Sequence, residues 1–376
     1  MRIGVIGYGN RISGVIKHVQ KQRSDCHVAA VVDVNPEKKQ KAVQDNGDVR
    51  TFETPEDMLN GMQLDGIMIG TRCSLHTPMA LKVLSSGLPL FLEKPVATTL
   101  EDAHHLKEGY ETSGNRKVVV SFPLRVTSIV QLVKEIVDSG KIGTVEHVQA
   151  VNNVPYGYVY YQGWYRDENE AGGLFLQKAT HDFDYINHVL GTKPESVAAM
   201  TSKQIFKGNK PAGLKCINCD ENRRCPESKA FGKDGSKNEH AYCSFAEDTG
   251  NEDSGSALVR YESGMHVSYS QNFFARKKAG ARGARFLGYK GTVEFDFYTG
   301  QIKVFMHHSN LVETYEISED GNHFGGDAVL AKNFIELMQG STDSVSTLDD
   351  GLQSALLCLK AKQSAITGTF QQVAWD

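Results

Sequence analysis

The chain has 376 residues, of which 40% are hydrophobic and 23% charged, a composition typical of a soluble globular protein and not of a disordered or fibrous one. Ordinary domains span roughly 100–200 residues, so two domains are expected. A net charge of −4 gives no electrostatic signal for nucleic acid or an anionic membrane, and neither partner is expected. No apolar run approaches the roughly 20 residues needed to span a bilayer, and no signal peptide pattern opens the chain, so a cytoplasmic location is expected.

The first third of the chain alternates short apolar runs with amphipathic segments. Strands are expected at 2–6, 28–33, 65–70, 89–92 and 117–122, with helices such as 76–86 and 100–113 between them. Apolar strands that alternate with helices are typical of a parallel sheet covered on both faces. The pattern therefore predicts an α/β fold, with a doubly wound parallel sheet over residues 1–123.

The rest of the chain, residues 124–376, shows a different pattern. Helices are expected at 126–139 and 178–190, because Gly140 and Gly191 follow them as stop signals. Strand-like runs without intervening helices follow at 257–261, 266–271, 292–297 and 302–307, and two helices at 328–338 and 348–367 close the chain. Consecutive strands of this kind predict a mostly antiparallel sheet, and hence a second domain of α+β type.

A glycine-rich turn follows the first strand and opens the first helix, as Gly7-Tyr8-Gly9-Asn10-Arg11-Ile12. In a dinucleotide site such glycines let the turn tighten and the backbone approach a pyrophosphate, whose charge the helix N-terminus favours. The third glycine of that fingerprint is missing, because Ile12 stands there and Gly14 is displaced by two residues. A tight turn in some other α/β fold remains the alternative at this point.

Asp33 at the end of the second strand favours the dinucleotide interpretation. A carboxylate at this distance from the glycines can accept hydrogen bonds from the adenosine ribose hydroxyls, which is the arrangement for NAD. No arginine for a 2′-phosphate follows, although Lys38 leaves some use of NADP open. The segment Asp33-Val34-Asn35-Pro36 could equally cap the next helix, and the two roles are compatible.

The motif Glu93-Lys94-Pro95 ends the fourth expected strand, so that Lys94 points into the crevice where a ligand of such a sheet lies. Together with the glycine turn, Asp33 and a His76 that opens a helix, it resembles the glucose–fructose oxidoreductase and inositol dehydrogenase family, Gfo/Idh/MocA. The resemblance continues through the segments 139–143 (Ser-Gly-Lys-Ile-Gly), 172–173 (Gly-Gly), 181–184 (His-Asp-Phe-Asp) and 323–327 (His-Phe-Gly-Gly-Asp). It spans nearly the whole chain.

The resemblance implies an NAD-dependent oxidoreductase that moves a hydride between a hydroxyl of a sugar, polyol or sugar derivative and the nicotinamide. It implies a Rossmann domain over 1–123 and a C-terminal domain over 124–376, whose large open sheet forms homo-oligomers, dimers or tetramers. Lys94 would lie beside the reacting hydroxyl, and His181 would be the general acid/base. The implied cofactor contacts are Gly7, Gly9, Asn10, Arg11, Ile12, Asp33, Thr71, His76, Glu93, Lys94 and Arg125.

One position departs from the family pattern. Family dehydrogenases usually carry an aspartate four residues before the histidine, but here that residue is Gln177, followed by Lys178. Because an amide cannot act as a base, an NAD-dependent glycoside hydrolase that uses transient oxidation, elimination and re-reduction stays open as an alternative. The expected substrate contacts are Lys94, Trp164, Arg166, Gln177, Lys178 and His181. Asp184 and His188, on the same helix face as His181, are interpreted as structural polar groups.

Two further clusters have a less specific meaning. Basic residues at Arg276, Lys277, Lys278, Arg282 and Arg285 are interpreted as a solvated turn, with an acidic substrate as the alternative. Four of the seven cysteines, Cys216, Cys219, Cys225 and Cys243, lie in a polar insertion over residues 206–255. Four thiolates would suit a structural zinc ion, but the spacing lacks a second tight pair, so free thiols and no metal site are expected.

Overall fold

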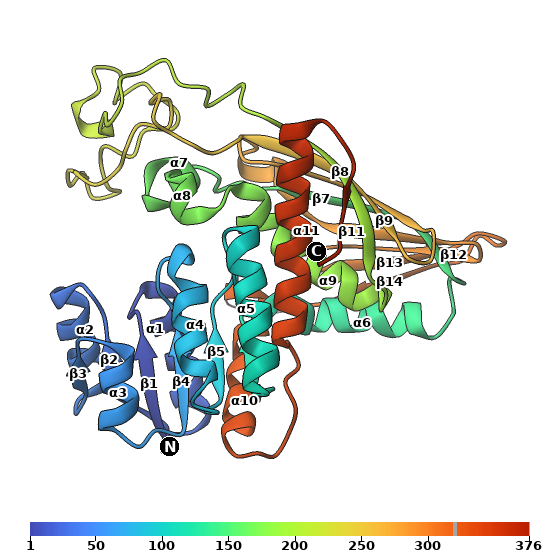
Figure 1. The fold of residues 1–376 in the computed structure, drawn as a ribbon. Coiled ribbons are helices and arrows are strands. Elements are labelled where there is room, and N and C mark those ends of the chain that lie inside the picture. The colour runs from blue at the N-terminus through green and yellow to red at the C-terminus, as the bar shows by residue number, and fades with distance from the viewer. Residues whose placement is uncertain (319–321, 376) are drawn as a thin grey trace.

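The computed structural model describes residues 1–318 and 322–375, which form two β-sheets with helices beside and between them (Figure 1). The first sheet has the strand order β3-β2-β1-β4-β5-β6, and every pairing in it is parallel. Its strands are β1 (Arg2–Ile6), β2 (His27–Val32), β3 (Arg50–Phe52), β4 (Gly66–Ile69), β5 (Leu90–Leu92) and β6 (Val118–Val120). The expected doubly wound parallel sheet is therefore confirmed.

Helices cover both faces of this sheet, as its apolar strands require. They are α1 (Asn10–Gln22), α2 (Pro36–Asn46), α3 (Pro55–Gly61), α4 (His76–Leu84) and α5 (Leu100–Ser113). All residues of β4, β5 and β6 are buried, because a parallel sheet between two helical layers has no solvent face. The sequence analysis missed β3, a three-residue edge strand in which only Phe52 is buried.

The second sheet has nine strands in the order β14-β13-β12-β11-β7-β10-β9-β8-β15. These are β7 (Val145–Asn153), β8 (Pro194–Ser202), β9 (Ser254–Tyr261), β10 (His266–Asn272), β11 (Ala281–Gly288), β12 (Gly291–Asp296), β13 (Gln301–Met306), β14 (Val312–Glu316) and β15 (Gln371–Gln372). Only the β7–β10 pairing is parallel. The predicted mostly antiparallel sheet is confirmed, although β7, β8, β11 and β14 were not expected.

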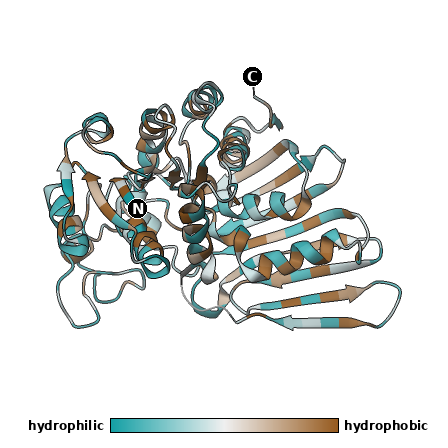
Figure 2. Ribbon diagram, turned by 90° about the horizontal axis from the view of Figure 1, so that it is seen from below, coloured by the Kyte–Doolittle hydropathy of each residue, from teal (hydrophilic) through white to brown (hydrophobic). Residues whose placement is uncertain are grey.

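One face of the large sheet is packed and the other is open. The helices α6 (Ser128–Asp138), α9 (Thr180–Leu190) and α11 (Leu348–Thr367) cover the inner face, and α11 runs between this sheet and the first domain (Figure 1). Along β9, buried and accessible residues alternate, and Figure 2 shows the corresponding bands of hydrophobic and hydrophilic residues on the strands. Such alternation is typical of a sheet with one solvent face.

The ends of these helices follow from local sequence signals. Thr347 and Asp350 form a reciprocal capping box at the start of α11, and Gly368 ends that helix in the left-handed conformation. Gly191 ends α9 in the same way, as the sequence analysis expected. Within the described residues, no helix is long and apolar enough to cross a membrane.

The helix α10 (Gly326–Met338) returns from the end of the chain to the first sheet. Its Phe334 ring packs edge-on against Phe91 of β5 at a centroid distance of 5.8 Å. Gly66 of β4 lies against the same helix, because a Cβ atom there would lie 2.7 Å from Met338 Sδ and 3.0 Å from the Phe334 ring. The core around β1 is thus completed by residues from the far end of the chain.

The insertion over residues 206–255 has little regular structure. It contains one 3₁₀ turn, Cys216–Asn218, and three isolated bridges that join Lys210 to Ala246, Lys215 to Tyr242 and Phe231 to Lys237. Its long loops extend over the short helices α7 (Val159–Gln162) and α8 (Glu168–Ala171) (Figure 1).

Candidate active site

The glycine turn after β1 has the geometry that a pyrophosphate site needs. Gly7 has φ +82°, and a Cβ atom there would lie 2.7 Å from the main-chain nitrogen of Thr71. Gly9 is the N-cap of α1, and no side chain caps this helix, so its first-turn N–H groups are available to a ligand. The residues therefore fit a dinucleotide phosphate at the N-terminus of α1.

The missing third glycine of the fingerprint is explained by the neighbouring strand. Ile12 is fully buried, and a Cβ atom on Gly70, just after β4, would lie only 2.6 Å from its Cβ. In the usual fingerprint a helix glycine permits close packing of helix and strand. Here the glycine stands on the strand side, and the bulky residue stands on the helix.

Asp33 connects the glycine turn to the end of β2. Its carboxylate accepts hydrogen bonds from the main-chain nitrogens of Tyr8 and Asn35, both at 2.8 Å. Each oxygen retains a second lone pair that a ribose hydroxyl can use. The cap of α2 is supplied by Asn35, which accepts from the Glu37 nitrogen at 2.8 Å, so the segment 33–36 caps this helix, as expected, while the Asp33 carboxylate keeps acceptor sites of its own.

Arg11 joins the first domain to α10. Its guanidinium contacts Glu93 at 3.0 Å and binds both oxygens of Asp327 at 2.7 Å. His323 also contacts Asp327, at 3.0 Å. Although burial opposes this, the hydrogen bonds from His323 and Arg11 and the charge of Arg11 lower the pKa of Asp327. The expected cofactor residues Arg11 and Glu93 thus bind each other in this structure, and a cofactor contact for either stays a prediction.

His76 is hydrogen-bonded to the Glu93-Lys94-Pro95 segment. Its buried Nδ1 donates to the Pro95 carbonyl at 2.7 Å, and burial lowers the pKa of the imidazole, which keeps it neutral. The neighbouring Thr71 contacts the glycine turn through its backbone. His76 therefore positions the segment that carries Lys94, and a direct cofactor contact stays a prediction.

Lys94 lies at the end of β5, where its ammonium group reaches the second domain. Its Nζ donates to the main-chain carbonyl of Gln177 at 3.0 Å. Burial, together with the charge of Lys178, lowers the pKa of Lys94 to about 8. A lysine side chain with a pKa this low can release or accept a proton near neutral pH.

Gln177 and Lys178 lie in a π-helical turn, Phe175–Ala179, directly before α9. Such turns are rare and often occur at functional sites. The Gln177 side-chain amide donates to the Ala171 carbonyl at 2.6 Å and to Cys73 Sγ at 3.3 Å. Lys178, only 6% exposed, donates from Nζ to the Tyr156 hydroxyl at 2.6 Å. Gln177 therefore acts on Lys94 through its main chain.

His181 in the first turn of α9 has an unused ring nitrogen. Its Nδ1 is buried and has no hydrogen-bond partner among the described residues. Burial and the charge of Lys94 hold its pKa well below the usual value, so the imidazole is neutral and able to take a proton. The ring lies 5.8 Å from that of Phe122 and 6.1 Å from that of His323.

Three expected site residues have other partners. Trp164 stacks on Tyr165 at 3.8 Å and carries the Arg72 guanidinium over its ring at 4.1 Å. Arg166 binds both oxygens of Asp248, at 2.8 and 2.5 Å, and so anchors the insertion. The substrate contacts expected of Trp164 and Arg166 stay predictions.

Arg125 is the third expected site residue that has other partners. It binds Asp184 through two hydrogen bonds, of 3.0 and 2.7 Å, and Asp350 through one of 2.7 Å. A cofactor contact for it stays a prediction. His188 accepts from the Gln131 amide at 3.2 Å, so Asp184 and His188 have the structural partners that the sequence analysis favoured.

The sequence analysis placed one basic residue wrongly. Arg282 was interpreted as part of a solvated turn, but it lies in β11 and is buried. Its Nε binds Asp182 at 2.8 Å, and that carboxylate also accepts from Tyr269 and Asn152. Its partner lies 100 positions away in the sequence, so no local signal could have revealed the pair.

The four cysteines of the insertion line one small cavity of about 10 Å³. They are Cys216, Cys219, Cys225 and Cys243, and none of the four forms a disulfide bond. In residues 1–318 and 322–375 no group of three or more histidine, cysteine, aspartate or glutamate side chains has an arrangement that could hold a metal ion. Free thiols in this insertion stay a prediction.

Two family models match the chain. The model for an oxidoreductase family with an NAD-binding Rossmann fold matches residues 1–122, and the model for the GFO/IDH/MocA C-terminal domain matches residues 130–294. The chain belongs to the Gfo/Idh/MocA family. The expected family, the NAD cofactor and the oxidoreductase class are thereby confirmed.

Individual Gfo/Idh/MocA relatives show how far this similarity extends. YteT of Bacillus subtilis (strain 168) is 28% identical over 74% of this chain and 73% of its own length. Inositol 2-dehydrogenase of Arthrobacter sp. (strain FB24) is 26% identical over 57% of this chain and 60% of its own length. The structure of the WlbA dehydrogenase from Bordetella pertussis, in complex with NADH and UDP-GlcNAcA, has a TM-score of 0.75 at 22% identity, covering 100% of this chain and 99% of that one.

Proposed function

We propose that the chain transfers a hydride between NAD and a hydroxyl-bearing carbon of a sugar, polyol or sugar derivative, with Lys94 and His181 as the catalytic residues. The observation that carries this proposal is the unused, buried Nδ1 of His181 within the electrostatic range of the Lys94 ammonium. Residues 1–123 serve as the cofactor domain, and residues 124–376, with the insertion 206–255, contact substrate and partner subunits.

The proton and charge requirements of alcohol oxidation match these two residues. When bound, NAD accepts the hydride from the carbinol carbon. The hydroxyl proton passes to the neutral imidazole of His181, and the oxygen becomes the carbonyl oxygen of the product. Lys94 stabilises the negative charge that develops on that oxygen before the carbonyl forms. In the reducing direction, protonated His181 returns the proton.

The named relatives support a carbohydrate-like substrate. Inositol 2-dehydrogenase is named for a polyol, and the WlbA structure holds a nucleotide sugar acid beside NADH. The glycoside hydrolase alternative gains no support from these comparisons. The Gln177 departure does not require it either, because the Gln177 side chain binds Ala171 and Cys73 and its carbonyl binds Lys94.

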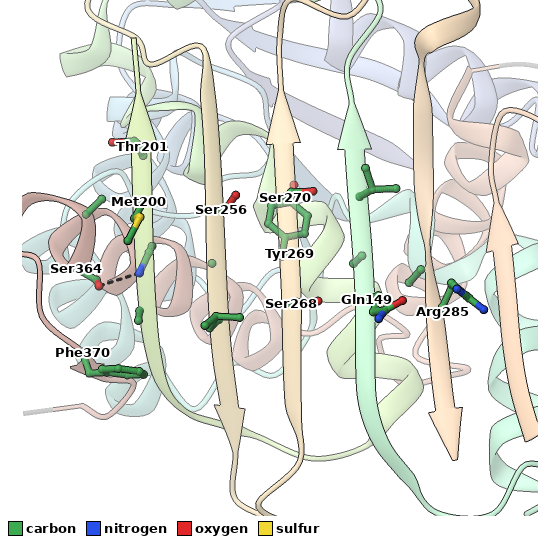
Figure 3. A pocket seen from close by; sticks show the side chains of 18 of the residues that line it. Gln149, Met200, Thr201, Ser256, Ser268, Tyr269, Ser270, Arg285, Ser364 and Phe370 are labelled. Carbon is green, nitrogen blue, oxygen red and sulfur yellow. Dashed lines mark hydrogen bonds between the residues drawn. The ribbon is translucent and has the colours of Figure 1, made fainter. Parts of the chain in front are cut away.

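A second copy of the chain is the proposed occupant of the open sheet face. Figure 3 shows this face, where a hollow of about 1020 Å³ lies over the strands β7 to β11. Small side chains such as Ser256, Ser268 and Ser270 form its floor, and Met200 and Phe370 at its edge are 79% and 66% exposed. Exposed apolar groups around a flat face suit sheet-to-sheet contact, and sedimentation of the purified protein measures the resulting oligomer.

The catalytic assignment is tested with Lys94→Met and His181→Ala. Each variant is expected to lower the rate of NADH formation by about 100-fold or more, while NAD still binds. The substrates are a panel of inositols, neutral sugars and sugar acids, and NAD binding is measured by calorimetry. Turnover within a few-fold of the parent in either variant would remove that residue from the mechanism.

A further inference from the structure

Two lysine ammonium groups lie close together in the candidate active site without a carboxylate partner. Lys178 Nζ binds the Tyr156 hydroxyl at 2.6 Å, and Lys94 Nζ binds the Gln177 carbonyl at 3.0 Å. No carboxylate oxygen of the described residues lies within 4.0 Å of either group. Both ammonium groups are therefore held by neutral acceptors alone.

The carboxylates around these lysines are already paired with arginines. Glu93 and Asp327 both bind Arg11, at 3.0 and 2.7 Å. Asp182 binds Arg282 at 2.8 Å. None of these three acids therefore supplies a full countercharge to the lysines, and the protein leaves the centre of the site with excess positive charge.

The titration of neighbouring groups reflects this excess charge. Although burial opposes ionisation of Tyr156, the charges of Lys178 and Arg282 lower the pKa of its phenol. At His181, burial comes first and the charges of Lys94 and Arg282 follow, and together they hold the pKa well below its usual value. Both shifts have the sign that a local positive field produces.

An uncompensated buried ammonium is costly, and an anion that enters the site removes that cost. A neutral sugar offers only hydroxyl dipoles to Lys178. Oxidised NAD adds the positive charge of its nicotinamide ring and increases the need for a countercharge. The protein therefore favours a substrate that brings its own negative charge.

We propose that the substrate carries a carboxylate, which accepts hydrogen bonds from the Lys178 ammonium and from the Tyr156 hydroxyl. The Tyr156 oxygen accepts from Lys178, so its own proton is free to be donated. A carboxylate has two oxygens, one for each of these donors. The inference rests on the proposed function and narrows its substrate class to sugar acids, such as uronic or aldonic acids.

The position of Lys178 places this anion site next to the reacting groups. Lys178 precedes His181 by three residues, and its charge is among the causes that lower the pKa of His181, so the two side chains lie near each other. Gln177 between Ala171 and Lys94 connects the same turn to the Lys94 ammonium. A carboxylate on Lys178 would thus hold an adjacent hydroxyl at the catalytic pair.

The test compares sugars that differ only in the acid group. Calorimetry measures binding of D-glucuronate against D-glucose and D-galacturonate against D-galactose to the NAD-loaded protein, and absorbance measures NADH formation. Because a hydrogen bond to a charged group contributes more than a neutral one, at least one acid is expected to bind about 10- to 100-fold more tightly than its neutral partner. Lys178→Met should abolish most of this preference, and Lys178→Arg should keep part of it.

Several controls make the result specific. Lys134→Met removes a lysine from the surface of α6, where it pairs with Asp138, and should leave the preference unchanged. If Lys178→Met does not fold, as judged by NAD binding, Tyr156→Phe removes the second donor and should reduce the preference. D-glucose 6-phosphate supplies an anionic group of different shape.

The outcomes separate this inference from the proposed function. Equal binding of every acid and its neutral partner would overturn the carboxylate site, and so would tighter binding of glucose 6-phosphate than of any acid. A phenolate at Tyr156 would itself neutralise Lys178, and acids and neutral sugars would then bind equally. Tighter binding of an acid without NADH formation would leave the anion site in place and refute the proposed oxidation.

Discussion

Replacement of Arg125 by methionine tests the buried network that joins the segment after β6 to the helices α9 and α11. The guanidinium makes two hydrogen bonds to Asp184, which is 1% exposed, and a third to Asp350. Methionine fills a similar volume but leaves the Asp184 carboxylate without a cationic partner. Removal of one partner of a buried ion pair costs about 3–5 kcal/mol, and this is the expected fall in the free energy of unfolding.

The assay is urea denaturation of the parent, Arg125→Met, Asp184→Asn and the double variant, with NAD titration of each folded protein. The double variant should recover much of the loss, because it removes the stranded charge together with its partner. NAD affinity should change little. A loss of stability below about 1 kcal/mol, combined with a large loss of NAD affinity, would refute the structural role and favour the cofactor contact expected from the family.

Three further substitutions or measurements follow from the site. Gln177→Asp shortens the side chain and removes the donor to the Ala171 carbonyl, so it should lower stability by about 1–3 kcal/mol; an unchanged urea midpoint would contradict this. Burial lowers the pKa of His188 to about 4, against about 6.5 when unfolded, so the unfolded chain binds more protons between these values. Stability should therefore fall as pH drops from 6.5 to 4, and His188→Gln should flatten that slope in melting experiments. Elemental analysis should find no zinc, and a thiol reagent should modify Cys219 and Cys225 before the buried Cys216 and Cys243. About one zinc per chain, with all four thiols protected from the reagent, would instead show a metal site.

Local patterns in the sequence were sufficient where burial is uniform. The strands β1, β4 and β5 are short apolar runs between turn residues, and their positions agree with the structure to within a few residues. Strands with one solvent-exposed face were harder to predict from the sequence. The strand β7, for example, carries polar residues such as Gln149 and Asn153 among its apolar ones. Period-two patterns with polar residues on both sides resemble loops.

Site residues that stand in a short sequence motif could be predicted. Residues whose role depends on a partner far away in the sequence could not. Lys94 and His181 stand in short motifs, and the structure connects both to the same helical segment. The pairing of Arg282 with Asp182 joins residues 100 positions apart, so its charge could not be assigned from neighbouring residues. The exchange of positions between Ile12 and Gly70 has the same cause, because the glycine that gives room lies on another element.

The return of α10 to the first sheet has a consequence for the order in which the protein can fold during synthesis. The apolar surfaces of β1 and β5 are covered by Leu330 and Phe334, which leave the ribosome only after the strands β7 to β14 of the second sheet have been made. The Asp327 carboxylate that Arg11 binds is also made only at that stage. A nascent chain of the first 123 residues would therefore expose an apolar strip, with Arg11 paired to Glu93 but lacking Asp327, and the cofactor domain becomes complete only after α10 has been made.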